Sequence, residues 1–236
     1  MLKAVFFDLY NTLARFDPPR EALQQRVCAE YGIRVTQEGI VRGYAAADDF
    51  MGRENAKLHL AKRTEQEQRD FFAKYERIIL HGSGVEAPLP LAGKIFQAIR
   101  AIPYHLALYD DALPCIRDLK SAGFVVGMIT NIYSDLQRTC RRLGLSECLD
   151  FWVTSKEAGS EKPHPRIFEI ALSKAGVAAP EALHVGDQYY SDVTGARAAG
   201  IEPVLIDRTG QVGKQDCTVV HALSELPGLL LPGPES

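Results

Sequence analysis

Three polar residues of this chain stand where they could share one chemical site. Asp8, Thr130 and Asp187 each close a short, β-rich apolar run. In an open parallel sheet, ligands bind beyond the carboxyl ends of the strands, near the point where the strand order reverses. If the three runs are neighbouring strands, these side chains face one crevice, where carboxylates can act as nucleophiles or as ligands of a hard metal ion.

Each of these positions also has an ordinary structural explanation when it is taken alone. These explanations are a turn at Asp8, a strand-to-helix loop at Thr130-Asn131, a solvated charge at Lys162-Pro163, and a turn and helix cap at Gly186-Asp187 and Asp192. Their joint order and spacing favour a common site over a series of unrelated local features.

The elements that must position these residues can be recognised from apolar runs. The runs are Ala4–Phe7, Phe124–Ile129, Phe151–Val153, Ala182–Val185, Pro203–Ile206 and Thr218–Val220. Most are apolar at nearly every position rather than alternating, which indicates strands covered on both faces. From Asp110 onward the runs alternate with helix-like segments, a pattern typical of βαβ units and a parallel sheet.

The stretch from about Ala14 to Ile102 differs, because it contains no convincing strand. Leu23, Val27 and Tyr31 share a helical face, Thr64 to Glu67 fits a capping box, and a helix is expected over Leu91 to Ile99. His81 to Gly84 is expected to be a loop. We therefore predict a core of residues 1–13 and 103–236 and an all-helical insert of residues 14–102.

Composition narrows the classes of partner. A net charge of -3 favours neither nucleic acid nor an anionic membrane, so a small anionic substrate would need local positive groups or a metal ion. The first apolar run is too short for a signal peptide, and no apolar stretch is long enough to span a bilayer. Five scattered cysteines indicate reduced thiols. We expect a cytoplasmic protein with a small-molecule substrate, and the sequence does not indicate its oligomeric state.

Taken together, the motifs resemble those of the haloacid dehalogenase-like hydrolase superfamily. The resemblance covers Met1–Leu13 and Tyr104–Asp207. It rests on Asp8 and Thr12 in an Asp-x-x-x-Thr loop, on Thr130, on Lys162-Pro163, on Gly186, Asp187 and Asp192 in Gly-Asp-x-x-x-x-Asp, and on Gly195 to Gly200. It implies an α/β fold, with a doubly wound parallel sheet (a Rossmann-like core) and an inserted all-helical cap.

The resemblance also implies roles for individual residues. Asp8 would be the nucleophile, Thr130 would hydrogen-bond the group under attack, and Lys162 would neutralise charge on Asp8 and on the transition state. Contacts to the substrate would come from Thr12, Asn131 and Tyr10.

A metal site follows from the same resemblance. Mg²⁺ would be bound by the carboxylates of Asp8 and Asp187 and by the backbone carbonyl of Tyr10, an all-oxygen set that suits this ion. Asp192 would contact the metal through water or orient Lys162.

One position departs from the pattern of the family's phosphatases. They usually carry a second Asp two residues after the nucleophile, as acid and base, whereas this chain has Tyr10. A phenol with a pKa near 10 is a weak base at neutral pH. The Asp-x-Tyr-x-Thr loop is similar to that of the 2-haloacid dehalogenases, which displace halide and need no proton.

Three functional readings remain open at this point. The first is a Mg²⁺-dependent phosphatase acting on a small phosphorylated metabolite through an aspartyl-phosphate. The second is a 2-haloacid dehalogenase with an aspartyl ester. Asp187 opposes it, and so does Phe168, which stands where those enzymes usually carry Tyr. The third is a slow or non-catalytic homologue that keeps the anion site.

Overall fold

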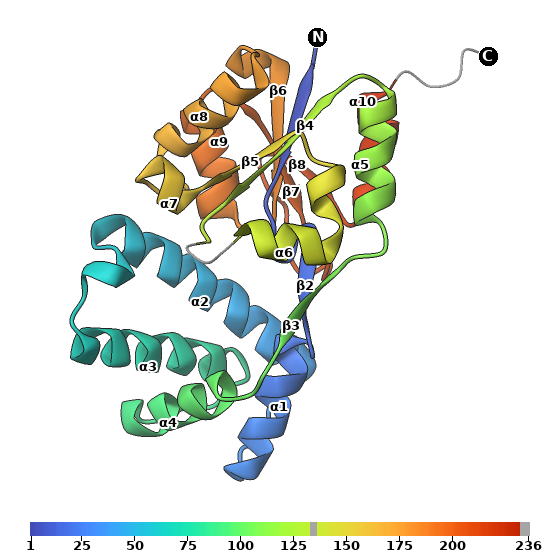
Figure 1. The fold of residues 1–236 in the computed structure, drawn as a ribbon. Coiled ribbons are helices and arrows are strands. Elements are labelled where there is room, and N and C mark those ends of the chain that lie inside the picture. The colour runs from blue at the N-terminus through green and yellow to red at the C-terminus, as the bar shows by residue number, and fades with distance from the viewer. Residues whose placement is uncertain (133–135, 232–236) are drawn as a thin grey trace. The chain divides into compact units, whose positions relative to one another are not determined.

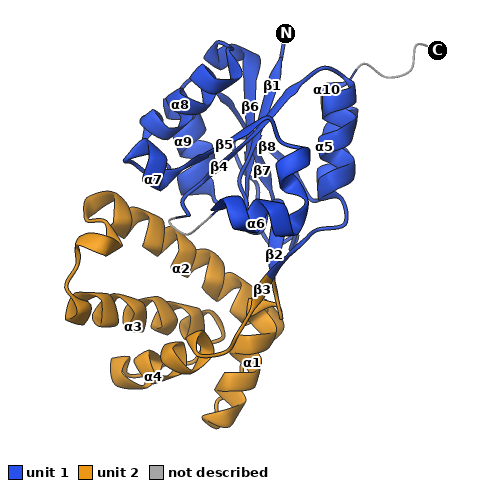
Figure 2. Cartoon of the chain, in the orientation of Figure 1, with its two compact units in different colours: residues 1–15, 106–236 blue, residues 16–105 orange. Residues whose placement is uncertain are grey.

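The computed structural model describes residues 1–132 and 136–231 and divides the chain into two compact units (Figure 2). Unit 1 comprises Met1–Arg15 and Leu106–Ser236, and unit 2 comprises Phe16–His105. The predicted insert of residues 14–102 therefore differs from unit 2 by two or three residues at each end.

The expectation that residues 14–102 contain no strand was wrong at their start, and a further short strand beyond them was not predicted. Strands β2 (Ala14–Asp17) and β3 (His105–Leu108) form a two-stranded sheet where the chain passes between the units. They escaped recognition because each has four residues, and only Ala14 in β2 and Leu106 in β3 are buried. Such short, half-exposed strands lack the apolar run that marks the strands of the main sheet.

Within the described residues of unit 1, six parallel strands form one sheet in the order β5-β4-β1-β6-β7-β8 (Figure 1). Helices lie against both faces, with α8 and α9 on one face and α5 and α10 on the other. This is the predicted doubly wound α/β fold. The strands are β1 (Ala4–Phe7), β4 (Val125–Thr130), β5 (Phe151–Thr154), β6 (Ala182–Gly186), β7 (Glu202–Ile206) and β8 (Thr218–Val220).

The continuous apolar runs predicted a sheet buried on both faces, and β1 shows why. All four of its residues are fully buried. Ala4 and Phe6 pack in a cluster with Ile167 and Phe168 of α8, while successive side chains of a strand point to opposite faces. The second face therefore needs apolar residues as well, and alternation disappears from the sequence.

The helices of unit 1 are α5 (Ala112–Ser121), α6 (Leu136–Leu143), α7 (Ser155–Ala158), α8 (Pro165–Ala175), α9 (Gly195–Ala198) and α10 (Leu226–Leu230). Gly144 and Gly176 follow α6 and α8 with φ of 72° and 66°, the left-handed conformation expected of a C-terminal glycine. The helix expected to be capped by Ser191 or Asp192 instead begins earlier, with a π-helical turn over Tyr189–Thr194. The Asp192 side chain is used elsewhere, as described below.

Residues 16–105 are all described and form four α-helices: α1 (Arg20–Glu30), α2 (Gln37–Lys57), α3 (Glu65–Gly82) and α4 (Leu89–Arg100). The capping box at Thr64 and Glu67 is present. Helix α3 extends to Gly82, so the loop predicted from His81 begins too early. Helix α2 was not predicted, because its sequence has no clear apolar periodicity. Cβ atoms at Gly43 or Gly82 would lie 2.3–2.5 Å from backbone oxygens of the facing helix, so these glycines let α2 and α3 approach closely.

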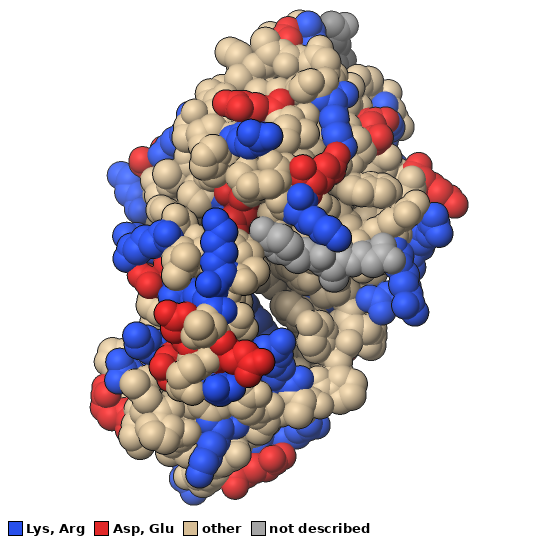
Figure 3. Space-filling model, turned by 60° about the vertical axis from the view of Figure 1, so that its left-hand side comes forward, with Lys and Arg blue, Asp and Glu red and all other residues tan. Residues whose placement is uncertain are grey.

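Charged side chains of both signs are interspersed over the face of the molecule shown in Figure 3. This mixture agrees with a net charge of only -3. Among the described residues, no helix is both long and apolar enough to cross a bilayer.

Candidate active site

The strand register brings the predicted polar residues to one edge of the sheet. Phe7 of β1 pairs with Met128 of β4 on one side and with Val185 of β6 on the other. Asp8 follows β1 directly, Thr130 ends β4, and Asp187 follows β6. Because β1 lies between β4 and β6, the strand order reverses around it, and this is where an open parallel sheet forms a ligand-binding crevice.

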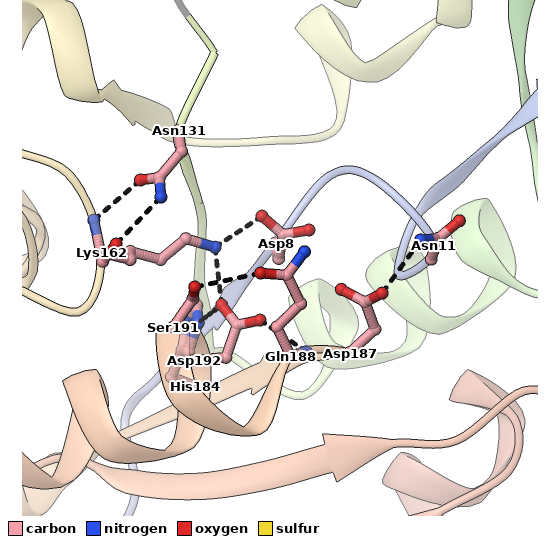
Figure 4. Close-up of polar contacts among 9 residues, drawn as sticks. All are labelled: Asp8, Asn11, Asn131, Lys162, His184, Asp187, Gln188, Ser191 and Asp192. Carbon is pink, nitrogen blue, oxygen red and sulfur yellow. Dashed lines mark hydrogen bonds and ion pairs between the residues drawn. The ribbon is translucent and has the colours of Figure 1, made fainter. Parts of the chain in front are cut away.

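Lys162 connects two of the carboxylates at this edge (Figure 4). Its Nζ atom lies 2.6 Å from Asp8 Oδ1 and 2.6 Å from Asp192 Oδ1. All three residues are buried, with Lys162 4%, Asp8 7% and Asp192 2% exposed. The ammonium group is thus shared between the predicted nucleophile and the last Asp of the acidic loop.

The backbone of Lys162 is held as firmly as its side chain. Asn131 donates from Nδ2 to the Lys162 carbonyl at 3.0 Å and accepts the Lys162 amide at Oδ1 at 2.8 Å. Asn131 therefore couples the end of β4 to the lysine loop. The sequence suggested a substrate contact for this side chain, and the structure shows that its amide group also positions Lys162.

Asp192 is fixed by three donors. Oδ1 contacts Lys162 and lies 2.9 Å from His184 Nε2, and Oδ2 accepts the Gln188 amide at 3.0 Å. A Cβ atom at Gly186 would lie 2.1 Å from Asp192 Cγ, so only glycine leaves room for this carboxylate. His184 is fully buried, as expected of a packed histidine, and its bond to Asp192 was not foreseeable from a single histidine inside an apolar run.

The loop after β1 places the remaining predicted residues. Asn11 donates from Nδ2 to Asp187 Oδ2 at 3.0 Å and has a φ of 56°, a left-handed conformation that Asn tolerates better than most residues. Tyr10 is half-buried. The hydroxyls of Thr12 and Thr130 are buried without a hydrogen-bond partner among the described residues. Buried hydroxyls normally have a partner, so these two are suited to receive an anion.

Comparison with known proteins identifies the family. The profile of the haloacid dehalogenase-like hydrolases matches residues 2–200 of the 236. The chain belongs to this family. It is therefore a hydrolase, and the motifs that carried the resemblance lie at the strand edge just described.

Relatives of this hydrolase include named phosphatases. The glyceraldehyde 3-phosphate phosphatase of Methanopyrus kandleri is 36% identical over 88% of this chain and 85% of its own length. The ribulose-1,5-bisphosphate 5-phosphatase of Halopiger xanaduensis is 29% identical over 88% and 85%. Among solved structures, a 2-haloacid dehalogenase from Pseudomonas syringae pv. Tomato is 26% identical, with a TM-score of 0.58 over 98% of both chains.

The electrostatics of the hydrolase site separate its two lysine-bound carboxylates. Burial raises the pKa of Asp8 to about 6 and outweighs the stabilising charge of Lys162. Burial also acts to raise the pKa of Asp192, but Lys162 and the hydrogen bond from His184 prevail and hold this pKa below its ordinary value. For Lys162, burial favours the neutral amine, whereas the two carboxylates raise its pKa and keep it charged.

The donor chemistry at this edge fits a hard divalent cation. The described residues contain no group of three or more His, Cys, Asp or Glu side chains arranged to hold a metal, and the predicted set has only the two carboxylates of Asp8 and Asp187. Sites that use few carboxylates, with water and phosphate oxygens completing the shell, are typical of Mg²⁺. Asp8, Asp187 and Asp192 carry three negative charges against the single positive charge of Lys162, so the residues present fit a cation.

Proposed function

We propose that this hydrolase is a Mg²⁺-dependent phosphatase that acts on a small phosphorylated metabolite through an aspartyl-phosphate on Asp8. The observation that carries the proposal is the Asp187 carboxylate, which Asn11 holds at the strand end next to that of Asp8. The two relatives named above as phosphatases support the same reading, and both of their named substrates are small sugar phosphates.

The excess negative charge of the site favours one substrate class over the other. A phosphate dianion or a haloacid carboxylate entering beside Asp8 and Asp187 meets repulsion that Lys162, already shared with Asp192, offsets only in part. Held by Asp8, Asp187 and the Tyr10 carbonyl, Mg²⁺ would supply positive charge to the oxygens of the transferring phosphoryl group. A dehalogenase needs no such ion, so the retention of Asp187 favours the phosphatase.

The reaction can be written with this chain's own residues. An oxygen of the Asp8 carboxylate attacks phosphorus, the bond from phosphorus to the ester oxygen breaks, and the leaving alcohol takes up a proton. Lys162 and the Thr130 hydroxyl stabilise the negative charge on the equatorial oxygens. Water then attacks the aspartyl-phosphate, releases inorganic phosphate and restores Asp8.

Proton handling is the weak part of this sequence. The position that supplies an acid and base in related phosphatases is Tyr10, whose phenol is a poor base near pH 7. Asp8 itself attacks as a carboxylate and needs no base. We therefore assign the highest turnover to esters with good leaving groups, such as aryl and acyl phosphates.

Tyr10 also supports a second candidate, the 2-haloacid dehalogenase. Halide leaves without a proton, and a named dehalogenase is 26% identical over nearly the whole chain. In this reading Asp8 forms an ester with the substrate carbon, and Asp187 has no role.

Unit 2 is proposed to be the cap that restricts access to Asp8. It is inserted after the first strand of the sheet and is built from four helices in its described residues, 16–105. Such an insert favours small substrates over macromolecules. The described cysteines form no disulfide, which agrees with a cytoplasmic location for the proposed enzyme.

One panel assay tests the proposed function. Phosphate and halide release are measured together, with and without Mg²⁺, on p-nitrophenyl phosphate, acetyl phosphate, glyceraldehyde 3-phosphate, ribulose 1,5-bisphosphate and 2-chloropropionate. Mg²⁺-dependent phosphate release supports the proposal. Halide release that is insensitive to EDTA would establish the dehalogenase instead.

The metal assignment has its own test. Asp187→Ala should weaken Mg²⁺ binding in a calorimetric titration by at least about tenfold, since even groups that only hydrogen-bond a metal's ligands are typically worth about 10–100-fold in affinity. Asp70→Ala, which removes an exposed carboxylate on α3, is the matched control and should leave Mg²⁺ binding unchanged. Equal affinities in the two variants would remove Asp187 from the site.

A further inference from the structure

Arg208 follows β7 and reaches the far end of the loop that carries the predicted nucleophile. Its Nη2 and Nε atoms donate to the Thr12 carbonyl at 2.7 and 3.3 Å. The same guanidinium pairs with both carboxylate oxygens of Asp111, through Nη1 at 3.1 Å and Nη2 at 2.9 Å. Nothing in the sequence motifs singles out this arginine.

Besides the Thr12 carbonyl, the guanidinium contacts the Tyr109 ring and the Asp111 carboxylate. Arg208 Cζ lies 3.7 Å from the centroid of the Tyr109 ring, close enough for a cation–π contact. The Tyr109 amide donates to the Leu13 carbonyl at 3.0 Å, next to the carbonyl that Arg208 holds. Asp111 in turn accepts the Leu223 amide at 2.8 Å. One side chain therefore joins the loop after β1 to the segment that follows β3.

The backbone next to Arg208 is held by several hydrogen bonds of Asp207. Asp207, which is 3% exposed, accepts the Thr209 amide at 3.1 Å and the Val212 amide at 2.8 Å. The Asp207 amide donates to Val220 of β8 at 2.8 Å. Arg208 therefore links the Thr12 carbonyl to a backbone segment that is hydrogen-bonded to β8.

Residues 8 to 14 form a compact turn, in which the Asn11 amide donates to the Ala14 carbonyl at 2.7 Å. The Leu13 and Ala14 amides donate to the Leu9 carbonyl at 3.0 and 2.8 Å, and Asn11 adopts its left-handed φ within the turn. A left-handed non-glycine residue is held in place only by its surroundings. Contacts with Lys162 and Asp187 hold this turn at Asp8 and Asn11. Arg208 adds a contact from outside at the Thr12 carbonyl, farther along the turn.

We propose that Arg208 is a positioning residue that fixes the nucleophile loop through the Thr12 carbonyl. In this role Arg208 fixes the positions of the Thr12 hydroxyl and the Tyr10 carbonyl relative to the Asp8 carboxylate, and it contacts neither the substrate nor the metal. The kinetic part of this inference rests on the proposed function, because it concerns the same reaction. The structural part, an ordered turn at residues 8–14, stands without it.

Hydrogen–deuterium exchange of the peptide covering residues 8–14 tests the structural part. In Arg208→Ala its exchange should rise at least about tenfold, because Leu13 and Ala14 lose the bond that steadies their turn. Arg63→Ala is the matched control. Arg63 likewise donates to backbone carbonyls, of Glu54 and Leu58 at 3.1 and 3.0 Å, and lies over the Phe71 ring, but it belongs to unit 2. Unchanged exchange in Arg208→Ala, or an equal rise in Arg63→Ala, overturns the proposal.

Turnover tests the kinetic part. A small misplacement of reacting groups can cost about 10²-fold, so Arg208→Ala should lose turnover by about this factor with a much smaller change in KM. Millimolar guanidinium should restore kcat in Arg208→Ala and leave Arg63→Ala unaffected, a response that a general loss of stability does not give. Unchanged kcat in a folded Arg208→Ala protein contradicts the positioning role.

The proposal can also be tested if Arg208→Ala does not fold or if the wild-type protein lacks phosphatase activity. If Arg208→Ala does not fold, Arg208→Lys decides, because an ammonium can pair with Asp111 but cannot span both partners as a fork. Its loop exchange should then rise while its fold persists, and wild-type exchange in this variant contradicts the proposal. If the wild-type protein hydrolyses no phosphate ester, the proposed function fails. The exchange experiment still tests whether Arg208 orders the turn at residues 8–14.

Discussion

Each unit of the chain buries a cluster of polar side chains, and the two clusters differ in their balance of charge. In unit 2, Gln24 donates to Glu76 and accepts from the Tyr44 hydroxyl at 3.1 Å. Beside them, Arg20 pairs with Asp48 at 2.9 Å and lies over the Tyr44 ring. Arg20 also pairs with Glu21 at 3.2 Å, where both side chains are 23% exposed and water screens the additional charge. Burial raises the pKa of Glu76 to about 7, so a proton neutralises much of its charge.

The cluster in unit 1 is left unbalanced. Lys162 serves two carboxylates, and Asp187 adds a third at the same strand edge. A buried polar network that is fully paired stabilises one conformation, whereas excess charge in a crevice needs a ligand. From this difference we infer that the balanced cluster in unit 2 stabilises the fold, whereas the unbalanced cluster in unit 1 serves ligand binding and chemistry.

The largest effect is expected from Asp8→Asn, which removes the nucleophile and leaves the shape of the side chain. Turnover should fall by about 10⁴-fold or more, because covalent catalysis has no substitute for this carboxylate. Circular dichroism should show an unchanged fold, and Asp70→Asn should keep full activity. A folded Asp8→Asn protein with more than a tenth of wild-type turnover would remove the unbalanced cluster from the reaction.

Lys162→Met should come next, because it leaves Asp8 and Asp192 buried without a cation between them. Removing one partner of a buried charge pair typically costs about 3–5 kcal/mol in the free energy of unfolding. Urea unfolding at pH 7 measures this loss. Lys174→Met, which breaks a partly exposed pair with Glu157, should cost less than about 1 kcal/mol. Equal losses in the two variants would mean that burial does not distinguish these lysines.

Tyr10→Asp sharpens the chemical side of the comparison by adding the missing acid and base. Turnover of an alkyl phosphate should rise by about 10²-fold, at the lower end of what acid–base help provides, and turnover of an aryl phosphate should rise less. The measurement is kcat/KM on both esters, and Tyr10→Phe separates the added carboxylate from the lost hydroxyl. Fast alkyl-ester hydrolysis by the wild type would assign acid–base work to another residue, and halide release lost in Tyr10→Asp would favour the dehalogenase.

The smallest effect concerns the balanced cluster and its pH dependence. The folded pKa of Glu76 is about 7 and its ordinary value is 4.5, so the folded chain holds a proton that the unfolded chain releases between these values. The contribution of Glu76 to stability is therefore greatest below pH 4.5 and falls as pH rises toward 7, by roughly 3 kcal/mol. In Glu76→Gln the fall of urea unfolding midpoints with pH should become shallower by this amount, whereas the exposed Glu65→Gln on the same helix should leave it unchanged.

The main sheet and the location of the site could be predicted from sequence because both leave local signals. A strand such as Ala4–Phe7 that is buried on both faces is apolar throughout, and Asp8 marks its end. The two short strands and helix α2 left no such signal. Half-exposed strands have no apolar run, and α2 mixes glycine, alanine and charge across its 21 residues.

Side-chain partnerships were beyond the sequence because they join distant positions. One example is the contact of His184 with Asp192, and another is the hydrogen bond from Arg208 to the Thr12 carbonyl. Both depend on the order of the strands in the sheet, which no local sequence pattern encodes. The roles expected of Asp8, Thr130, Lys162 and Asp187 remain predictions that the experiments above address. The structure adds the geometry in which they can be tested.

The central place of β1 also has a consequence for biogenesis. Its partners begin at residues 125 and 182, so the strand that leads to Asp8 is made long before either neighbour exists. At about 5–20 residues per second, roughly 10–40 s of synthesis separate Asp8 from Asp192. During that interval a fully apolar strand waits on the ribosome without a sheet, while the helical insert is translated. The strand ends that carry the candidate site are therefore among the last parts of the sheet to be assembled on the nascent chain.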